Sequence, residues 1–438
     1  MGLLIGIGAT RPQYAYDYYY GIEWDITASN PKVTRIGKVE LHQSLPLQNM
    51  MRRCILKDNG EVNYYLHAND STKRDNGAAA NLTGADGMYM VELPDTYVRF
   101  ETDGNKSRCL TSTEALPGFH LWKQDYVSAV EATVERATSK LAAVCNNTAA
   151  YRGGGNQDDW DALSKTQLGR PATNISLTTF RTYARNRGSV AWNCNVYSIQ
   201  KKLFWLYAIE YATFDSQAAF TAELDENGYH QGGLGDGVTT LDGTKWSNFC
   251  GYYPVIPCGV TNSLGNKSGV VAYDMPTDYD ATVKTVYVPS YRGVENPFGH
   301  LWKWTDGCKV MIQSDADGGL SEFYACDEPA NFTSSGTTNY EKRGDIPREN
   351  GYVKAICLGE DGEIMPLSTG GGSTTYFCDY FYTSLPTSGI SERGVLFGGT
   401  ASHGASAGFV SASTTDTASL ATAHYGSRLC FIPQIETA

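Results

Sequence analysis

Residues that could carry redox or metal chemistry are spread singly along this chain. The sequence has eleven Cys and seven His. Cys357, Cys378 and Cys430 lie far apart in the C-terminal part, with no C-x-x-C pair anywhere, and no two His have the H-x-x-x-H spacing of a helical metal site. We therefore expect a protein that is not an enzyme and that uses no cofactor.

Two segments come closest to an ion-binding motif. The glycine-rich segment at residues 232 to 237 fits neither the dinucleotide-binding nor the P-loop glycine pattern, so we interpret it as a cluster of turns. Acidic loops such as Asp315-Ala-Asp317 have oxygen ligands of the kind that calcium prefers, but their spacing is too general to identify a site. The sequence therefore does not decide whether the protein binds calcium.

The clearest signal of function is a stretch of small side chains at residues 394 to 427. It has one charged residue, Asp416, and no Lys, Arg, Glu or Asn. From 398 to 426, 22 of 29 positions are Gly, Ala, Ser or Thr, which is a composition typical of disorder. The apolar segments 395 to 397 and 429 to 432, however, resemble buried strands. We interpret the stretch as a binding face held between two core strands, with a flexible Ser/Thr loop as the alternative.

The elements that must position this face belong to a large acidic chain. With 438 residues it exceeds the usual size of a single core, and a net charge of -12 argues against general nucleic-acid binding. Tyr outnumbers Phe by 29 to 15, which suits partly wet surfaces. The irregular Cys spacing favours buried thiols in a reducing cytoplasm. We expect synthesis without a signal peptide and no membrane helix, because no apolar run approaches ~18 residues.

The length allows one large domain with insertions or two domains, and we expect a short N-terminal segment followed by one large domain. Residues 1 to 48 look like an N-terminal attachment or oligomerisation segment with an aromatic run at 14 to 20, although a disordered terminus explains that run equally well. Residues 49 to 438 form the main domain. Within it the sequence predicts a hairpin over 54 to 66, with its turn at Asp58-Asn59-Gly60, and strands over 88 to 100 and 283 to 288.

Helices are predicted at two places and are undecided at a third. Ser176 can cap a helix over 177 to 186, and apolar spacing predicts another helix over 196 to 207, with residues 200 to 202 on its wet side. The segment 126 to 144 has helical apolar spacing, but it is rich in β-branched residues and contains a turn signal.

Several motifs, taken in order, resemble one family. The string ENPFGHLWKW at residues 295 to 304 resembles the Asn-x-Phe-Gly and Gly-Asn-Val-Trp-Glu-Trp signature of the formylglycine-generating-enzyme-like (sulfatase-modifying factor) branch of the C-type lectin fold. His300 and Lys303 depart from it, and the linker between its halves is missing. Residues 169 to 185 resemble the family's Pro-Val-Thr-x-Val-Ser segment and the helix after it. Gly398-Gly399 and residues 426 to 431 resemble its Gly-Gly-Ser-Trp and Gly-Phe-Arg close.

The resemblance covers roughly residues 50 to 433, and it implies an α+β C-type lectin fold with long loop insertions. In relatives the segment corresponding to 126 to 144 is extended, so the resemblance favours strands there. Catalytic members use a close cysteine pair that binds copper, and another branch uses an iron site of clustered His. This chain has neither arrangement. A metal-dependent oxidase is therefore an alternative rather than the expected function.

Within that fold, the small-residue stretch looks most like the variable region of proteins diversified by retroelements. These systems mutate adenines in Asn codons, which yields Ser, Thr, Ala, Gly, Asp, His, Tyr and Leu among fixed Gly and Ala. The resemblance implies a fixed framework at Gly398, Gly399, Gly404, Gly408, Phe409, Gly426 and Arg428. The candidate variable, ligand-binding positions are Ser402, His403, Ser406, Ser411, Ser413, Thr415, Asp416, Leu420, Thr422, His424 and Tyr425.

Together these observations predict a receptor- or ligand-binding protein of a phage particle, such as a tail or head fibre, or of a bacterial surface. Its expected role is adsorption to a host, and its expected partners are a host cell-surface protein or glycan. The N-terminal segment is expected to contact other virion or surface proteins. Oligomerisation, as a trimer for example, would raise avidity. A structural virion decoration protein is a further alternative.

Overall fold

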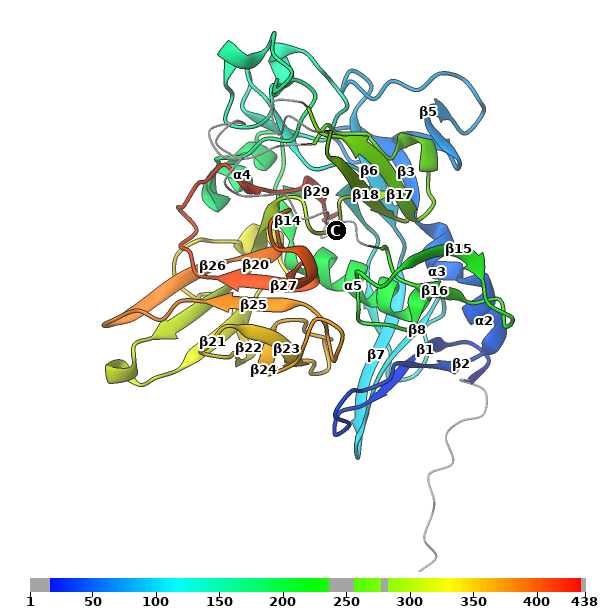
Figure 1. Ribbon diagram of the computed structural model, residues 1–438, viewed down its shortest axis with the longest axis vertical. Helices are drawn as coiled ribbons and strands as arrows, with labels where there is room; N and C mark the ends of the chain where they lie inside the picture. Colours follow the sequence, from blue (N-terminus) through cyan, green and yellow to red (C-terminus); the bar gives the residue numbers. More distant parts are fainter. Residues whose placement is uncertain (1–15, 236–255, 277–282, 435–438) are drawn as a thin grey trace, which may run out of the picture.

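The computed structural model describes residues 16 to 235, 256 to 276 and 283 to 434. Strands dominate these residues, and helices are few (Figure 1). The mostly β character agrees with the sheets of the expected α+β class, and the finer C-type lectin assignment stays a prediction. None of the helices in the described residues is long and apolar enough to cross a membrane. The α-helices considered below are α2 (Val39–Ser44), α3 (Pro46–Met50), α4 (Leu177–Arg185) and α5 (Tyr197–Tyr211).

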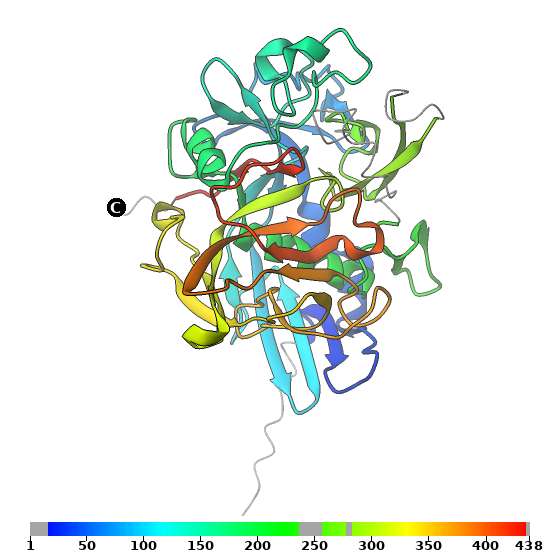
Figure 2. The same ribbon diagram turned by 60° about the vertical axis from the view of Figure 1, so that its left-hand side comes forward.

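The largest sheet carries the small-residue stretch and is coloured yellow to orange in Figures 1 and 2. Most of its neighbouring strands are antiparallel, but β25 and β27 pair in parallel. Its main path runs through β22 (Glu341–Asp345), β21 (Ser321–Ala325), β20 (Trp302–Gln313), β26 (Ile390–Gly398), β27 (Gly408–Thr414), β25 (Tyr380–Thr383), β23 (Gly351–Ile356) and β24 (Pro366–Thr369). Two short strands join β20 in parallel, β14 (Asn195–Val196) and β28 (Tyr425–Gly426).

Two further sheets and three small ones complete the described strands. One sheet runs β2 (Thr34–Gly37), β1 (Tyr20–Asp25), β8 (Lys106–Ser112), β7 (Thr96–Asp103) and β9 (His120–Trp122). Another runs β13 (Trp192–Asn193), β29 (Cys430–Phe431), β10 (Asp125–Ser128), β6 (Met88–Leu93), β3 (Arg52–Leu56), β4 (Val62–His67) and β5 (Asp70–Arg74). The small ones are β11 (Thr133–Glu135) with β12 (Lys140–Ala142), β15 (Phe220–Leu224) with β16 (His230–Gly232), and β17 (Gly269–Asp274), β18 (Thr285–Tyr291) and β19 (Val294–Glu295).

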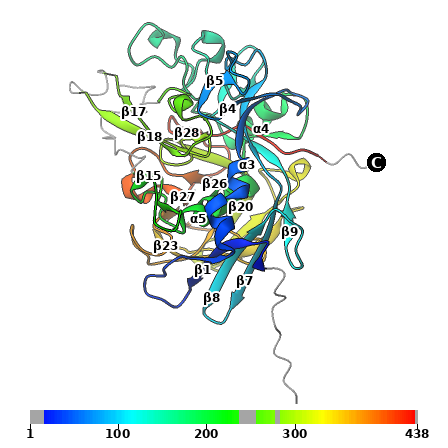
Figure 3. The ribbon, with the colours of Figure 1, turned by 90° about the vertical axis from the view of Figure 1, so that its right-hand side faces the viewer.

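Helix α5 lies between the largest sheet and the β1–β8 sheet, with α3 beside it (Figures 1 and 3). Its Trp205 ring stacks on Trp24 of β1 at 5.8 Å, and its Tyr207 ring lies 5.0 Å from Phe409 of β27. Aromatic burial on both sides accounts for this central position, because large rings remove the most apolar area from water. The helix predicted over 196 to 207 is therefore confirmed.

The prediction that residues 200 to 202 face water is wrong. Gln200, Lys201 and Lys202 are at most 3 % exposed. The Lys201 ammonium lies 3.1 Å from a Glu363 carboxylate oxygen, and that of Lys202 lies 3.4 Å from Asp125. Both carboxylates are distant in sequence, and a buried charge is tolerated only when it is paired. A helical pattern alone therefore could not reveal this burial.

The other helix and the strands that the sequence predicted occur at the places that local signals indicated. Helix α4 begins after Ser176, whose hydroxyl accepts a hydrogen bond from the Thr179 amide at 3.2 Å. The hairpin of β3 and β4 and the strand β18 occur where they were predicted. The alternating segment 88 to 100 forms most of β6 and β7. The segment 126 to 144 contains β10, β11 and β12, which confirms strands over a helix there.

The described part of the N-terminal segment is built into the fold rather than set apart from it. Strand β1 pairs with β2 on one side and with β8 on the other, and Tyr20 and Ile22 are fully buried. The Tyr20 hydroxyl donates to the Gln48 side-chain oxygen at 2.8 Å. Residue 48 is thus no structural boundary, while the attachment or oligomerisation role stays a prediction. Residues 1 to 15, and the last two residues of the glycine cluster at 232 to 237, lie outside the described residues.

Candidate functional site

The small-residue stretch folds as an ordered part of the largest sheet. It begins in β26, turns at Gly398 and Gly399, and returns as β27. A loop then leads to β28 and on to β29, which pairs with β10. The two predicted core strands are confirmed in β26 and β29. The strand β27 was not predicted, because its Gly, Ser and Ala residues have low β propensity.

Side chains of this stretch line a pocket of about 280 Å³. Strands β20, β25, β27 and β28 contribute to it, as do the loops that follow β26 and β27. Six of the eleven candidate variable positions lie here, so the fold brings together residues separated by more than twenty positions in the chain. The pocket is lined by Trp302, Tyr382, Thr400, Ser402, His403, Ser413, Thr415, His424 and Tyr425.

Aromatic rings form the walls of the pocket, and a small residue leaves room between them. The His403 ring lies 5.2 Å from Trp302 and 5.1 Å from Tyr382, measured between ring centroids. Ser413 is opposite Tyr382 in β25 and opposite Leu396 in β26. Because Ser413 is small and buried between larger neighbours, the face of the sheet is hollow at this point.

His403 is a neutral imidazole held in one orientation. The Thr400 amide donates to its Nδ1 at 2.9 Å, so Nδ1 is the unprotonated nitrogen and the ring proton sits on Nε2. Burial, with a smaller contribution from the nearby His424, lowers the pKa of His403 to about 4. Burial also lowers the pKa of His424, against the opposing charge of Asp416. Both imidazoles are therefore uncharged at neutral pH.

Asp416 organises the other side of the pocket. Its carboxylate accepts hydrogen bonds from the Tyr425 hydroxyl at 2.6 Å and the Thr415 hydroxyl at 2.7 Å. The Thr415 hydroxyl also lies 3.0 Å from that of Ser413. Burial together with Asp416 raises the pKa of Tyr425. A chain of hydroxyls thus runs from the acidic rim to the floor of the pocket.

The remaining candidate positions surround the pocket without lining it. Ser411 is buried and donates to the Tyr380 carbonyl at 3.1 Å. The Ser406 hydroxyl lies 3.3 Å from the Tyr352 hydroxyl, and Thr422 places its own 3.3 Å from His424 Nδ1. Asp416 acts from the rim as described, and Leu420 is 38 % exposed. The stretch therefore mixes side chains that face solvent with others that the fold uses internally.

Comparisons with known proteins add little to this geometry. No family model matches the chain, and no curated protein matches it. The solved structures that match include one titled Major Tropism Determinant U1 Variant, which is 11 % identical, with 85 % of this chain and 78 % of that chain covered. Its TM-score is 0.21. A score this low does not establish a shared fold.

The segment that carries the family resemblance is buried beneath the pocket. His300 and Lys303 are at most 2 % exposed, so both side chains belong to the core. The Glu131 carboxylate lies 2.5 Å from His300 Nδ1 and 3.0 Å from the Lys303 ammonium. Burial lowers the pKa of Lys303 to about 8, against the attraction of Glu131. An ideal Cβ on Gly398 would lie 3.4 Å from that ammonium, so this layer fits closely under the turn.

The cysteines of the described residues are free thiols, and most of them are buried. Burial raises the pKa of Cys357, Cys378 and Cys430, the opposite of what a reactive thiolate needs. Within the described residues, no three His, Cys, Asp or Glu side chains gather closely enough to hold a metal ion. Cys250 lies outside those residues.

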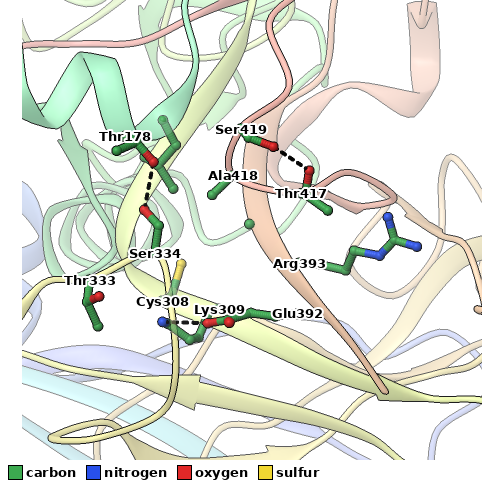
Figure 4. A pocket seen from close by; sticks show the side chains of 12 residues that line it. Thr178, Cys308, Lys309, Thr333, Ser334, Glu392, Arg393, Thr417, Ala418 and Ser419 are labelled. Carbon is green, nitrogen blue, oxygen red and sulfur yellow. Dashed lines mark hydrogen bonds and ion pairs between the residues drawn. The ribbon is translucent and has the colours of Figure 1, made fainter. Parts of the chain in front are cut away.

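A second cavity of about 180 Å³ is lined in part by the loop that follows β27 (Figure 4). Its lining includes Thr417, Ala418 and Ser419, together with the first turn of α4. The ammonium of Lys309 is already paired there with Glu392 at 2.7 Å. None of the eleven candidate variable positions lines this cavity. It is therefore a less suitable candidate for the site.

Three residues that line the pocket were not among the candidates. Trp302 belongs to the string at residues 295 to 304 that carries the family resemblance, and no role in the site was assigned to it. Tyr382 comes from the segment Tyr380-Phe381-Tyr382, whose period of two could have indicated a strand with both tyrosines on one face. Phe381 is fully buried, as that pattern requires. No sequence pattern distinguished Thr400 from the other small residues of the stretch.

Proposed function

We propose that this chain is a receptor- or ligand-binding protein in which residues 394 to 427 present exchangeable side chains around the pocket. The observation that carries the proposal is the gathering of six of the eleven candidate positions on one cavity. Short side chains on an ordered strand and its loops can change without removing the core beneath them. Tyr, Ser and Gly are also suited to adaptable recognition at a low entropic cost.

The finer form of the proposal rests on the order of the sequence motifs. The scaffold would be a C-type lectin fold of the formylglycine-generating-enzyme-like branch, and a retroelement would diversify the stretch. The protein would act in adsorption to a host, on a phage fibre or a bacterial surface, with avidity from oligomerisation. A reverse transcriptase gene beside a near-copy of the codons for 394 to 432 would support this form. Related loci whose substitutions lie outside the candidate positions would contradict it.

Filling the pocket tests the binding role directly. Ser413→Trp puts an indole into the cavity from its floor, and Ser402→Trp blocks it from an exposed position at the rim. We expect both variants to lose at least roughly tenfold in affinity for cells of a susceptible strain, found by screening a strain panel with the labelled protein.

Ala421→Trp is the matched control, because Ala421 is exposed in the same stretch and lines neither cavity. It should bind cells like the wild type. Thermal melting of all three variants identifies any that fail to fold. Wild-type cell binding by a folded Ser402→Trp variant would show that the pocket is not the binding site.

A further inference from the structure

The pocket is one end of a longer row of aromatic rings. Tyr352 of β23 is paired across the sheet with Tyr380 of β25, and their ring centroids are 4.9 Å apart. Tyr380 is in turn 4.7 Å from Tyr382, which lies 5.1 Å from His403 in the pocket wall. With Trp302 beyond His403, five rings follow one another without a break.

These rings are on the outer face of the sheet. Phe381, between the two β25 tyrosines, is fully buried on the opposite face, whereas Tyr352, Tyr380 and Tyr382 are half-buried. Tyrosine combines an apolar ring with a hydroxyl that prefers water, so a row of them suits a ligand with both apolar and polar surfaces. The row also extends past the pocket, which suits a ligand longer than the pocket itself.

The chemistry of the pocket favours an uncharged ligand. Among the residues that the structure describes, no Lys or Arg lines it, and its two imidazoles are neutral at ordinary pH. The Asp416 carboxylate at the rim would repel an anion, and its hydrogen bonds from Tyr425 and Thr415 already satisfy it in part. The polar groups that remain around the cavity are mainly hydroxyls of Ser and Thr, which can both donate and accept hydrogen bonds.

Size and shape narrow the ligand further. A volume of about 280 Å³ is at the small end of known ligand pockets, which hold roughly 300 to 1,000 Å³. It has room for a single ring-sized group. A sugar ring presents C–H bonds to an aromatic face and hydroxyls to its edge, which matches the ring walls and the hydroxyl rim. Those hydroxyls already have internal partners, such as Thr415 for Ser413 and Ser402 for Thr400. Because a hydroxyl can both donate and accept, a sugar can use bonding capacity that an apolar protein side chain would leave unused.

We infer that the pocket binds one neutral sugar ring of a surface polysaccharide, and that the following sugars lie along Tyr382, Tyr380 and Tyr352. The inference rests on the proposed binding function and names the ligand class for the same site. Recognition in this arrangement comes from ring stacking and hydroxyl contacts. It needs no bridging metal ion.

A panel of purified oligosaccharides tests this inference, with EDTA present throughout. The full-length protein is titrated with neutral hexasaccharides of glucose, mannose and galactose, with the matching disaccharides, and with sialylated oligosaccharides as acidic comparators. We expect at least one neutral hexasaccharide to bind and the acidic comparators to bind at least roughly tenfold more weakly. Binding to none of the neutral sugars, or equal binding of the acidic ones, would overturn the inference.

Two variants separate the pocket from the row. Ser402→Trp should weaken the disaccharide and the hexasaccharide alike, whereas Tyr380→Ala should weaken only the hexasaccharide, by roughly three- to tenfold. Ala421→Trp again serves as the control. If Tyr380→Ala leaves hexasaccharide affinity unchanged, the row is not part of the binding surface.

Treatment of susceptible cells distinguishes this inference from the proposed function. Periodate cleaves the vicinal diols of sugars, so it should abolish binding of the protein, while protease treatment of the cells should leave binding intact. The reverse result would mean that the partner is a protein. In that case the proposed binding function stands and the sugar assignment fails. Wild-type cell binding by the folded Ser402→Trp variant would instead remove the proposed function.

Discussion

Framework and candidate positions alternate within one stretch of chain, yet their surroundings differ. A Cβ at Gly408 would lie 2.0 Å from an Asp379 carboxylate oxygen, and one at Gly426 would lie 2.9 Å from Leu301. By contrast, Ser402 and Leu420 are exposed. The stretch is therefore uniform in composition, but its positions differ in how well they tolerate a larger side chain. The space around each residue decides which positions can change.

Not every candidate position is exposed. Ser411 and Ser413 are buried, but Ser413 faces the pocket, while the Ser411 hydroxyl is bonded to the backbone of β25. A larger residue at 413 would enter the cavity. At 411 it would have to displace the hydrogen bond. We therefore expect Ser411 to be the least exchangeable of the candidate positions.

Removing a framework residue should have the largest effect. The buried Arg428 guanidinium donates to the backbone carbonyls of Ser128 at 3.0 Å and Asn296 at 2.6 Å, and also to that of Glu295. Arg428→Ala leaves three buried acceptors without partners and opens a cavity. We expect a loss of roughly 3 to 5 kcal/mol in the free energy of unfolding, measured by urea denaturation.

Arg52→Ala is the control for that loss. The Arg52 side chain is 47 % exposed in its ion pair with Glu92, so removing it should cost less than about 1 kcal/mol. Equal effects of the two substitutions would mean that Arg428 does not hold the framework together.

A glycine substitution gives the next largest effect. Gly408→Ala forces the new methyl group against the Asp379 carboxylate, which accepts a hydrogen bond from the Val410 amide at 2.7 Å. We expect a loss of roughly 1 to 3 kcal/mol in the free energy of unfolding, from crowding and from the weakened hydrogen bond. Gly155→Ala is the matched control, because its new Cβ would meet nothing closer than 3.8 Å. If Gly408→Ala leaves the free energy of unfolding unchanged, Gly408 is not a fixed framework position.

The effect that is smallest at neutral pH concerns acid sensitivity and one candidate position. Burial lowers the pKa of His403 to about 4, whereas an unfolded His titrates near 6.5. Between these values the unfolded state binds more protons, so this residue's contribution to stability is present above about pH 6.5 and is lost as the pH falls to about 4. His403→Asn should remove that part of the acid sensitivity. Urea denaturation of both proteins from about pH 7.5 to about 4 tests this, and parallel curves would contradict it.

The sequence predicted elements whose causes are local. The cap at Ser176, the turn at Asp58 to Gly60 and the apolar ends of residues 394 to 432 each depend on residues close together in the chain. The six candidate positions that meet in the pocket were chosen from the residue types present in the stretch, and composition is also a local property.

What the sequence could not predict depends on distant partners. Lys201 and Lys202 were assigned to water because their carboxylates, Glu363 and Asp125, are 162 and 77 positions away. The role of Tyr382 in the pocket depends on a parallel pairing between β25 and β27 that no local pattern encodes. In each case the neighbour that decides the outcome is created by the fold.

The order of the segments along the chain has one more consequence. Arg428 and β29 follow the small-residue stretch in the sequence, and they join it to β10 some 300 positions earlier. A frameshift or stop codon introduced within the stretch would therefore also remove the residues that close the core. Such a product could not complete its fold, so it would be open to proteolysis. Only copies that keep the reading frame intact would yield a folded protein, so folding would select against frameshifts and stop codons in the stretch.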